Sequence, residues 1–133
     1  MSEILLTVDE DEQRAIAQAE KLASLDWDLD ATTVTILHVF TDNVEGASIG
    51  QFGPARKARD VLEDAGFDIE LSETSGDPGD QVVDYARDND VDLICVGGRK
   101  RSPTGKALFG SVSQEVMLST DCPVLFSTAG SNE

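Results

Sequence analysis

Residues 91–113 read VDLICVGGRKRSPTGKALFGSVS, and this stretch carries three structural signals in a row. An unbroken apolar run at residues 93–96 predicts a strand that is covered on both faces. The segment from Gly97 to Ser111 then holds four of the ten basic residues of the chain and none of its 26 acidic ones. Clustered cations attract anions, and glycine lets backbone N–H groups come close to them. We therefore expect a buried strand, an anion-binding loop and a helix that begins at Ser111.

The rest of the chain alternates between strand and helix patterns. Strands are predicted at residues 4–8, 33–40, 69–74, 91–96 and 124–128, and helices at residues 11–25, 54–65, around 82–86 and 111–119. This alternation predicts an α/β fold with one doubly wound, five-stranded parallel sheet flanked by helices, as a single domain over residues 1–133. Ligands bind such sheets beyond the carboxyl ends of the strands, where the winding reverses. If strands 4–8 and 91–96 are neighbours, Asp9 faces the cationic segment there.

The formal net charge of −16 limits the partners that the chain can have. A surface this acidic repels nucleic acid and anionic membranes, so we expect neither as a partner. No apolar run reaches the length of a membrane span, and the N-terminus lacks a signal-peptide pattern, which together predict a cytoplasmic protein. The excess of acids, with only four lysines, favours a halophilic source because high salt screens the repulsion.

Several familiar chemistries do not fit this sequence. It contains neither the GxxxxGK[ST] of a P-loop nor the GxGxxG of a dinucleotide fold. The acidic loop after the first strand disfavours flavin mononucleotide, and a phospho-accepting receiver domain needs an Asp and a Lys that later strands do not supply. Cys95 and His38 lie inside predicted strands and are interpreted as core residues, and Cys122 as a second buried thiol. A single histidine makes a zinc centre improbable.

The glycines of the cationic segment follow a spacing seen in a known family. Its ATP-binding members carry Gly, two residues, Gly, nine residues, then Gly and Ser or Thr. Here Gly97 matches the first position, Lys100 replaces the second glycine, and Gly110 with Ser111 completes the pattern. The continuation GSVS, the later CPVL, the strand ending LHV and an Asp after the first strand are typical as well. From about residue 4 to residue 126, the chain resembles a universal stress protein domain, a Rossmann-like fold of the adenine nucleotide alpha hydrolase type.

The resemblance implies a site for ATP, with or without Mg²⁺, and assigns roles to particular residues. Asp9 and Val39 would hold the adenosine end, and Gly97 would approach the nucleotide through its backbone. The phosphate end would contact Arg99 and Lys100 from the cationic segment and Gly110, Ser111, Val112 and Ser113 around the start of the last helix. Two interpretations of Lys100 stay open. Its ammonium group either takes over the contact of the missing glycine, or it marks a loop that no longer binds ATP.

The resemblance also implies a function, a stress-response homodimer that binds ATP as a switch or regulator and pairs through its C-terminal strand. We expect no catalytic residues, since no general base stands out near the cationic segment, and at most slow hydrolysis of ATP. The alternative is a nucleotide-free interaction module whose basic loop binds inorganic anions or an acidic partner.

Overall fold

The computed structural model describes residues 2–8, 12–40, 53–100, 107–109 and 111–129. The elements in chain order are β1 (Ser2–Thr7), α1 (Glu12–Ala23), a 3₁₀ turn (Leu29–Ala31), β2 (Thr32–Phe40), α2 (Gly53–Asp64), β3 (Asp68–Ser75), α3 (Pro78–Asp88), β4 (Leu93–Lys100), β5 (Ala107–Phe109), α4 (Ser111–Ser119) and β6 (Val124–Ala129). Five strands pair in parallel in the order β3-β2-β1-β4-β6. The predicted fold class is confirmed, and β1 and β4 are neighbours.

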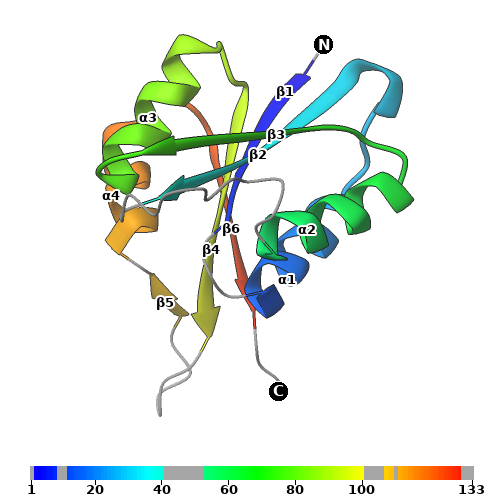
Figure 1. Cartoon of the computed structure of the whole chain (residues 1–133), viewed down its shortest axis with the longest axis horizontal. Helices are drawn as coiled ribbons and strands as arrows, with labels where there is room; N and C mark the ends of the chain where they lie inside the picture. Colours follow the sequence, from blue (N-terminus) through cyan, green and yellow to red (C-terminus); the bar gives the residue numbers. More distant parts are fainter. Residues whose placement is uncertain (1, 9–11, 41–52, 101–106, 110, 130–133) are drawn as a thin grey trace.

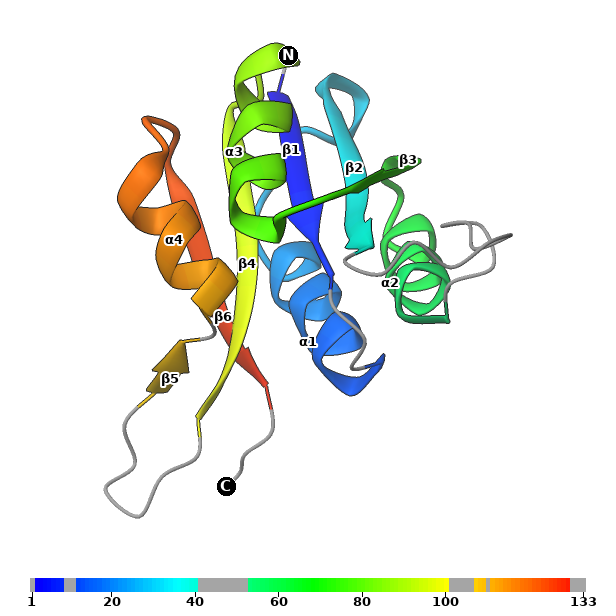
Figure 2. The same cartoon turned by 60° about the vertical axis from the view of Figure 1, so that its left-hand side comes forward.

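The helices form two layers with the sheet between them (Figure 1). Turning the molecule shows α3 and α4 together on one side of the strands and α1 and α2 on the other (Figure 2). The strands are apolar on both faces because each face needs its own cover. Ile4, Leu6 and Ile36 pack in the cluster under α1 and α2, whereas Leu5 and Leu37 pack in the cluster under α3 and α4.

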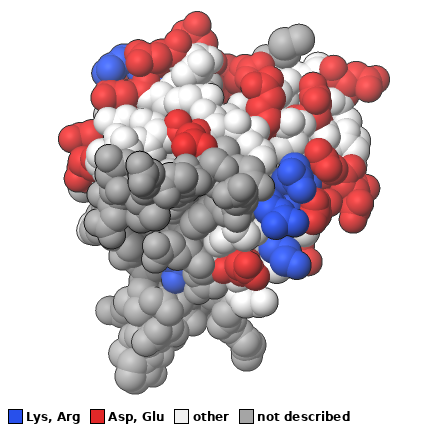
Figure 3. Space-filling model, viewed as in Figure 1, with Lys and Arg blue, Asp and Glu red and all other residues white. Residues whose placement is uncertain are grey.

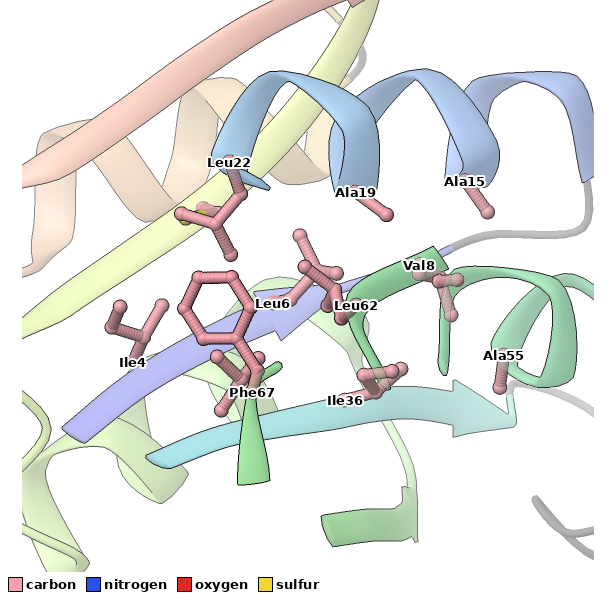
Figure 4. Packing of buried hydrophobic residues seen from close by; sticks show 13 residues of the cluster. Ile4, Leu6, Val8, Ala15, Ala19, Leu22, Ile36, Ala55, Leu62 and Phe67 are labelled. Atoms are coloured by element: carbon pink, nitrogen blue, oxygen red, sulfur yellow. The ribbon is translucent and has the colours of Figure 1, made fainter. Parts of the chain in front are cut away.

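The α1–α2 layer buries the larger of these two clusters (Figure 4). Leu22 and Ala19 descend from α1 toward Ile4 and Leu6 of β1, and Phe67 fills the space below Leu22. All five side chains are at most 5% exposed. Each large apolar side chain buried in this way stabilises the fold by about 1.5–3 kcal/mol. The small alanines let α1 approach the sheet closely.

The predicted boundary of the fourth strand was wrong. The apolar run predicts a strand that ends at Val96, but β4 continues through Gly97 to Lys100. Its final residues pair in parallel with β6 as far as Arg99, and in antiparallel register with β5 from Gly98 to Lys100. Glycines and cations carry no hydrophobic period, so only the two neighbouring strands hold this segment extended. The cationic segment is therefore a strand, a connection and a short returning strand.

The position of β5 follows from the pairing. At residues 98 and 99, β4 pairs with both β5 and β6, so these two strands lie on opposite edges of β4. At residues 94 and 95, β4 pairs with both β1 and β6. Hence β5 lies on the β1 edge of β4, beyond the point where β1 ends. The returning strand stands next to the place where the winding of the sheet reverses.

Charge is distributed unevenly over the described surface. Acidic side chains are spread widely over the face in Figure 3, whereas the largest group of basic ones lies on the side of α1 and α2, apart from others elsewhere on that face. Arg56, Lys57 and Arg59 all lie on α2, and the first two are exposed. None of the described helices combines the length and the apolar character that a membrane crossing requires.

Candidate functional site

The carboxyl ends of β1 and β4 meet at the reversal point of the sheet, where a doubly wound fold binds its ligands. The β2 and β3 strands lie on one side of β1, and β6 lies on the far side of β4. Three chain segments converge here, namely the end of β1, the glycine end of β4 and the first turn of α4.

A hydroxyl group joins β4 to α4. Ser113 is 6% exposed, and its Oγ donates a 2.8 Å hydrogen bond to the carbonyl oxygen of Gly97. Val112 packs beside it in the apolar cluster that includes Val39 and Val96. This bond fixes the first turn of α4 against the end of β4. Free N–H groups and a partial positive charge at the start of a helix suit an anion, so the first turn of α4 is held where the cationic segment ends.

A buried amide lies across the opposite side of Gly97. Gln18 of α1 is 3% exposed, and a Cβ atom placed on Gly97 would lie 2.7 Å from its Cδ and 2.9 Å from its Oε1. A real Cβ atom does not approach another atom so closely, so only glycine at position 97 lets the Gln18 amide lie there. Gly97 does not adopt a left-handed backbone, since its φ lies outside that region. Within the described residues, its glycine is explained by this close approach.

The end of β1 is held by side chains. The register between β1 and β4 stops at Leu6 opposite Cys95. One residue later, the carbonyl oxygen of Thr7 accepts a 2.9 Å hydrogen bond from Gln18 Nε2. The carbonyl oxygen of Val8 lies 2.8 Å from Nδ1 of His38, which is buried. A carbonyl can only accept, so His38 carries a proton on Nδ1.

The structure brings together four of the residues predicted for the site. Val39 near the end of β2, Gly97, Val112 and Ser113 lie around the reversal point, and Val39 is 8% exposed. Arg99 and Lys100 belong to β4 and Ser111 starts α4, but their side chains lie outside what the structure describes. Asp9 and Gly110 fall outside the described residues altogether. The roles expected for these residues stay predictions.

Sequence reasoning missed Gln18 and gave His38 only a core role. A signal for Gln18 existed, because it is the one polar residue on the buried face of α1, between Ala15 and Leu22. A polar group at such a position must find a partner, so its presence predicts a bond to the backbone. His38 carries an additional restraint, since the ring of Phe40 meets it edge-on with centroids 4.5 Å apart.

Three carboxylates gather where α3 begins. Asp77 caps α3 by accepting a 3.1 Å bond from the Asp80 N–H group. One carboxylate oxygen of each of Asp77, Asp80 and Glu115 lies within 4.8 Å of the others, a geometry that a hard cation can use. A hydrogen bond to Asp80, a small desolvation and repulsion from Asp77 and Asp80 raise the pKa of Glu115. At acid pH, protonated Glu115 therefore keeps its hydrogen bond to Asp80.

The thiols of the described chain offer no reactive group to the site. Burial, with a smaller contribution from nearby Cys122, raises the pKa of Cys95 to about 12. Burial also raises the pKa of Cys122, which is only partly buried. Neither forms a disulfide, and a thiol with a raised pKa is a poor nucleophile at neutral pH. The prediction of free thiols is confirmed, with Cys122 more exposed than expected.

The sequence profile of the universal stress protein family matches residues 1–127. The chain belongs to the universal stress protein family. The universal stress protein Slr1230 of Synechocystis is 34% identical over 92 residues, which are 67% of this chain and 31% of that protein. This stress protein thus spans about a third of that relative's length.

Solved structures of the family share this stress protein's fold. A universal stress protein from Archaeoglobus fulgidus superimposes with a TM-score of 0.75 at 27% identity, over 95% of this chain and 98% of that one. A second Archaeoglobus fulgidus structure, determined in complex with dAMP, gives a TM-score of 0.69 at 22% identity. The match covers 95% of this chain and 97% of that one. A universal stress protein in complex with cAMP gives 0.72 at 23% identity, with 97% and 98% covered. At these two identities, the likeness establishes the fold.

Proposed function

We propose that this universal stress protein binds an adenine nucleotide, ATP in the first place, at the carboxyl ends of β1 and β4. The observation that carries the proposal is the bond from Ser113 to the Gly97 carbonyl. It holds the first turn of α4 at the end of the cationic segment, where the sheet reverses. Family members with the same fold were solved with dAMP and cAMP bound, which supports the choice of an adenine nucleotide.

The proposed roles follow the position of each residue. Asp9, which follows β1, and Val39 hold the adenosine end, and Gly110, Ser111 and the α4 N-terminus receive the phosphates. Ser113 uses its single proton on Gly97, so its hydroxyl must rotate before it can donate to a phosphate. Arg99 and Lys100 supply positive charge to the same end. We assign no catalytic residue, and the nucleotide acts as a signal rather than as a substrate that turns over.

The backbone conformation at Lys100 shows what a lysine in place of the family's second glycine requires. Lys100 lies in β4 opposite Ala107 of β5, an extended conformation that any residue adopts. The lysine therefore needs no left-handed backbone here, a conformation that would cost a side chain about 1–2 kcal/mol. Its ammonium group takes the place of the glycine as a phosphate contact, made from an unstrained strand.

Titration calorimetry with ATP, AMP, adenosine and sulfate in molar KCl tests the proposal. We expect the wild-type chain to bind ATP, and Gly110→Val to abolish binding without unfolding the protein. We expect Lys100→Ala to weaken ATP about 10- to 100-fold, as for a partly desolvated charge contact, and to leave adenosine unchanged. Lys57→Ala, an exposed lysine on α2, removes the same charge and is the matched control.

Three results would contradict the proposal. Binding of sulfate but not of ATP or adenosine supports the nucleotide-free interaction module instead. Stronger ATP binding by Lys100→Gly than by the wild type shows that the lysine obstructs the site. Release of phosphate above a protein-free blank shows that the nucleotide is a substrate.

We further propose a homodimer that pairs through β6. Among the described strands β6 pairs only with β4, so its other edge is open to a second copy. An open apolar edge risks uncontrolled association, which a symmetric pairing removes. Light scattering should give about 28 kDa, twice the 14.2 kDa of the chain, and a stable monomer at tens of micromolar contradicts the pairing.

A further inference from the structure

Thr7 ends β1 and Val8 follows it, and the carbonyl groups of both residues lie beyond the ladder with β4. Thr7 and Val8 lead directly into Asp9, the residue expected to hold the adenosine end. The Val8 N–H group still donates to the Leu37 carbonyl of β2 at 3.1 Å. On the acceptor side, the carbonyls of Thr7 and Val8 are each bonded by a side chain, from Gln18 and His38 respectively.

Both side chains are fixed in their own positions. Gln18 is 3% exposed on the face of α1 that packs on the sheet, and its amide lies against Gly97. His38 is 8% exposed, and Phe40 restrains its ring from the side. Thr7 adds a third link, since its Oγ1 donates to the Cys95 carbonyl of β4 at 3.3 Å. The exit of the chain from β1 is therefore held from α1, β2 and β4 at once.

We propose that Gln18 and His38 are positioning residues for nucleotide binding, which act by holding the Thr7 and Val8 carbonyls, the backbone that leads into Asp9. This inference rests on the proposed function, because it assumes a nucleotide at this edge. Gln18 has a second effect. Its amide also lies against Gly97, so one side chain links the end of β1 to β4. A group held within a fraction of an ångström binds more tightly than one that must be ordered on contact.

The bonds predict which substitutions preserve binding. Asn carries its amide nitrogen near the place of the histidine Nδ1, whereas Gln carries it nearer to Nε2. His38→Asn should therefore keep the bond to Val8 and the affinity, and His38→Gln should lose both. Gln18→Met, which keeps the volume but cannot donate, should lose the bond to Thr7. Each loss should weaken ATP and adenosine by the same factor, about five- to tenfold, since Asp9 serves the end that both ligands share.

A cycle with Asp9→Ala separates positioning from general stability. In the Asp9→Ala background, Gln18→Met and His38→Gln should cause no further loss of adenosine affinity, because there is no carboxylate left to aim. Their effect on the urea midpoint should be the same in both backgrounds. If Gln18→Met does not fold, Gln18→Leu replaces it, since a leucine side chain cannot donate to Thr7 either.

The outcomes are distinguishable by titration of the wild type and the variants in molar KCl. If the wild type binds ATP and adenosine, and His38→Gln and the Gln18 variant bind them with unchanged affinity, the inference is overturned but the proposed function stands. A further loss in the Asp9→Ala background also overturns it. No adenine nucleotide binding by the wild type overturns the proposed function and the inference with it. Nitrogen NMR of His38 should show the proton on Nδ1, and a proton on Nε2 alone rejects the bond to Val8.

Discussion

Replacing Gly97 by alanine should destabilise the protein, although the same change in an unobstructed strand would stabilise it. With an ordinary backbone, Gly→Ala reduces the entropy of the unfolded chain and contributes about 0.4–1 kcal/mol of stability. At position 97, the new Cβ would lie 2.7 Å from Gln18 Cδ, and Gln18 is buried and bonded to Thr7. Overpacking of this kind, or loss of the Thr7 bond, costs about 1–3 kcal/mol. We expect a net destabilisation of about 1–2 kcal/mol.

Removing the Gln18 amide should reverse the sign of the stability change caused by Gly97→Ala. In a Gln18→Ala background the obstruction is gone, so Gly97→Ala should stabilise the protein by the ordinary increment. The two changes therefore couple by about 2 kcal/mol, which urea denaturation in molar KCl resolves. Gln13→Ala is the matched control, since Gln13 is exposed on the same helix and should leave the full cost of Gly97→Ala in place. Equal costs of Gly97→Ala in the wild-type and Gln18→Ala backgrounds would refute the reasoning.

Three further predictions address charge and thiols. The pKa of Glu115 is raised in the folded protein, so its protonated carboxyl group stabilises the fold at pH values below its ordinary pKa of 4.5. This stabilisation is lost as the pH rises through the raised pKa. Glu115→Gln should therefore raise the melting temperature at pH 7 and not at pH 4, more than the exposed control Glu20→Gln does. Equal shifts for both variants contradict the raised pKa of Glu115. Cys95, with a pKa of about 12, should react with a disulfide reagent only on unfolding, so Cys122→Ser should leave no native reactivity, and a rapid reaction in that variant rejects the burial. The melting temperature should climb from dilute buffer to molar KCl as the Debye length falls to about 3 Å, and a flat curve removes the argument for a halophilic source.

The fold could be predicted because its signals are periodic. Unbroken apolar runs mark β1, β2 and β4 as buried strands, and the alternation at Ile69 and Leu71 marks β3 as the outer strand that the pairing places at the sheet edge. The Asp77 cap of α3 is equally local, because its partner lies three residues away. A signal within a few residues can be recognised without knowing what the segment packs against.

The extended end of β4 and the side-chain hydrogen bonds at the end of β1 could not be predicted in this way. Residues 97–100 are extended because β5 and β6 lie beside them, and neither contact leaves a period in the sequence. The bond from His38 to Val8 spans 30 residues, and that from Ser113 to Gly97 spans 16. Such bonds between a side chain and a distant carbonyl depend on the finished topology. The family pattern did name Gly97 and Ser113, but without the reason that each is needed.

The extension of β4 places positions 99 and 100 on opposite faces of the sheet. Successive positions of a strand belong to opposite faces, so position 100 shares the face of Val96, which packs under α3 and α4, and position 99 shares the face of Cys95 under α1. The first turn of α4 receives the phosphates in our proposal, and α4 lies on the face of position 100. Of two successive positions in a regular strand, only one belongs to that face. Arg99→Ala should therefore weaken ATP less than Lys100→Ala, by about threefold or less through long-range charge alone, when both are titrated at the same salt concentration. Equal losses in the two variants would show that the segment leaves the strand to bind the nucleotide, and that the pairing of Lys100 with Ala107 opens in the complex.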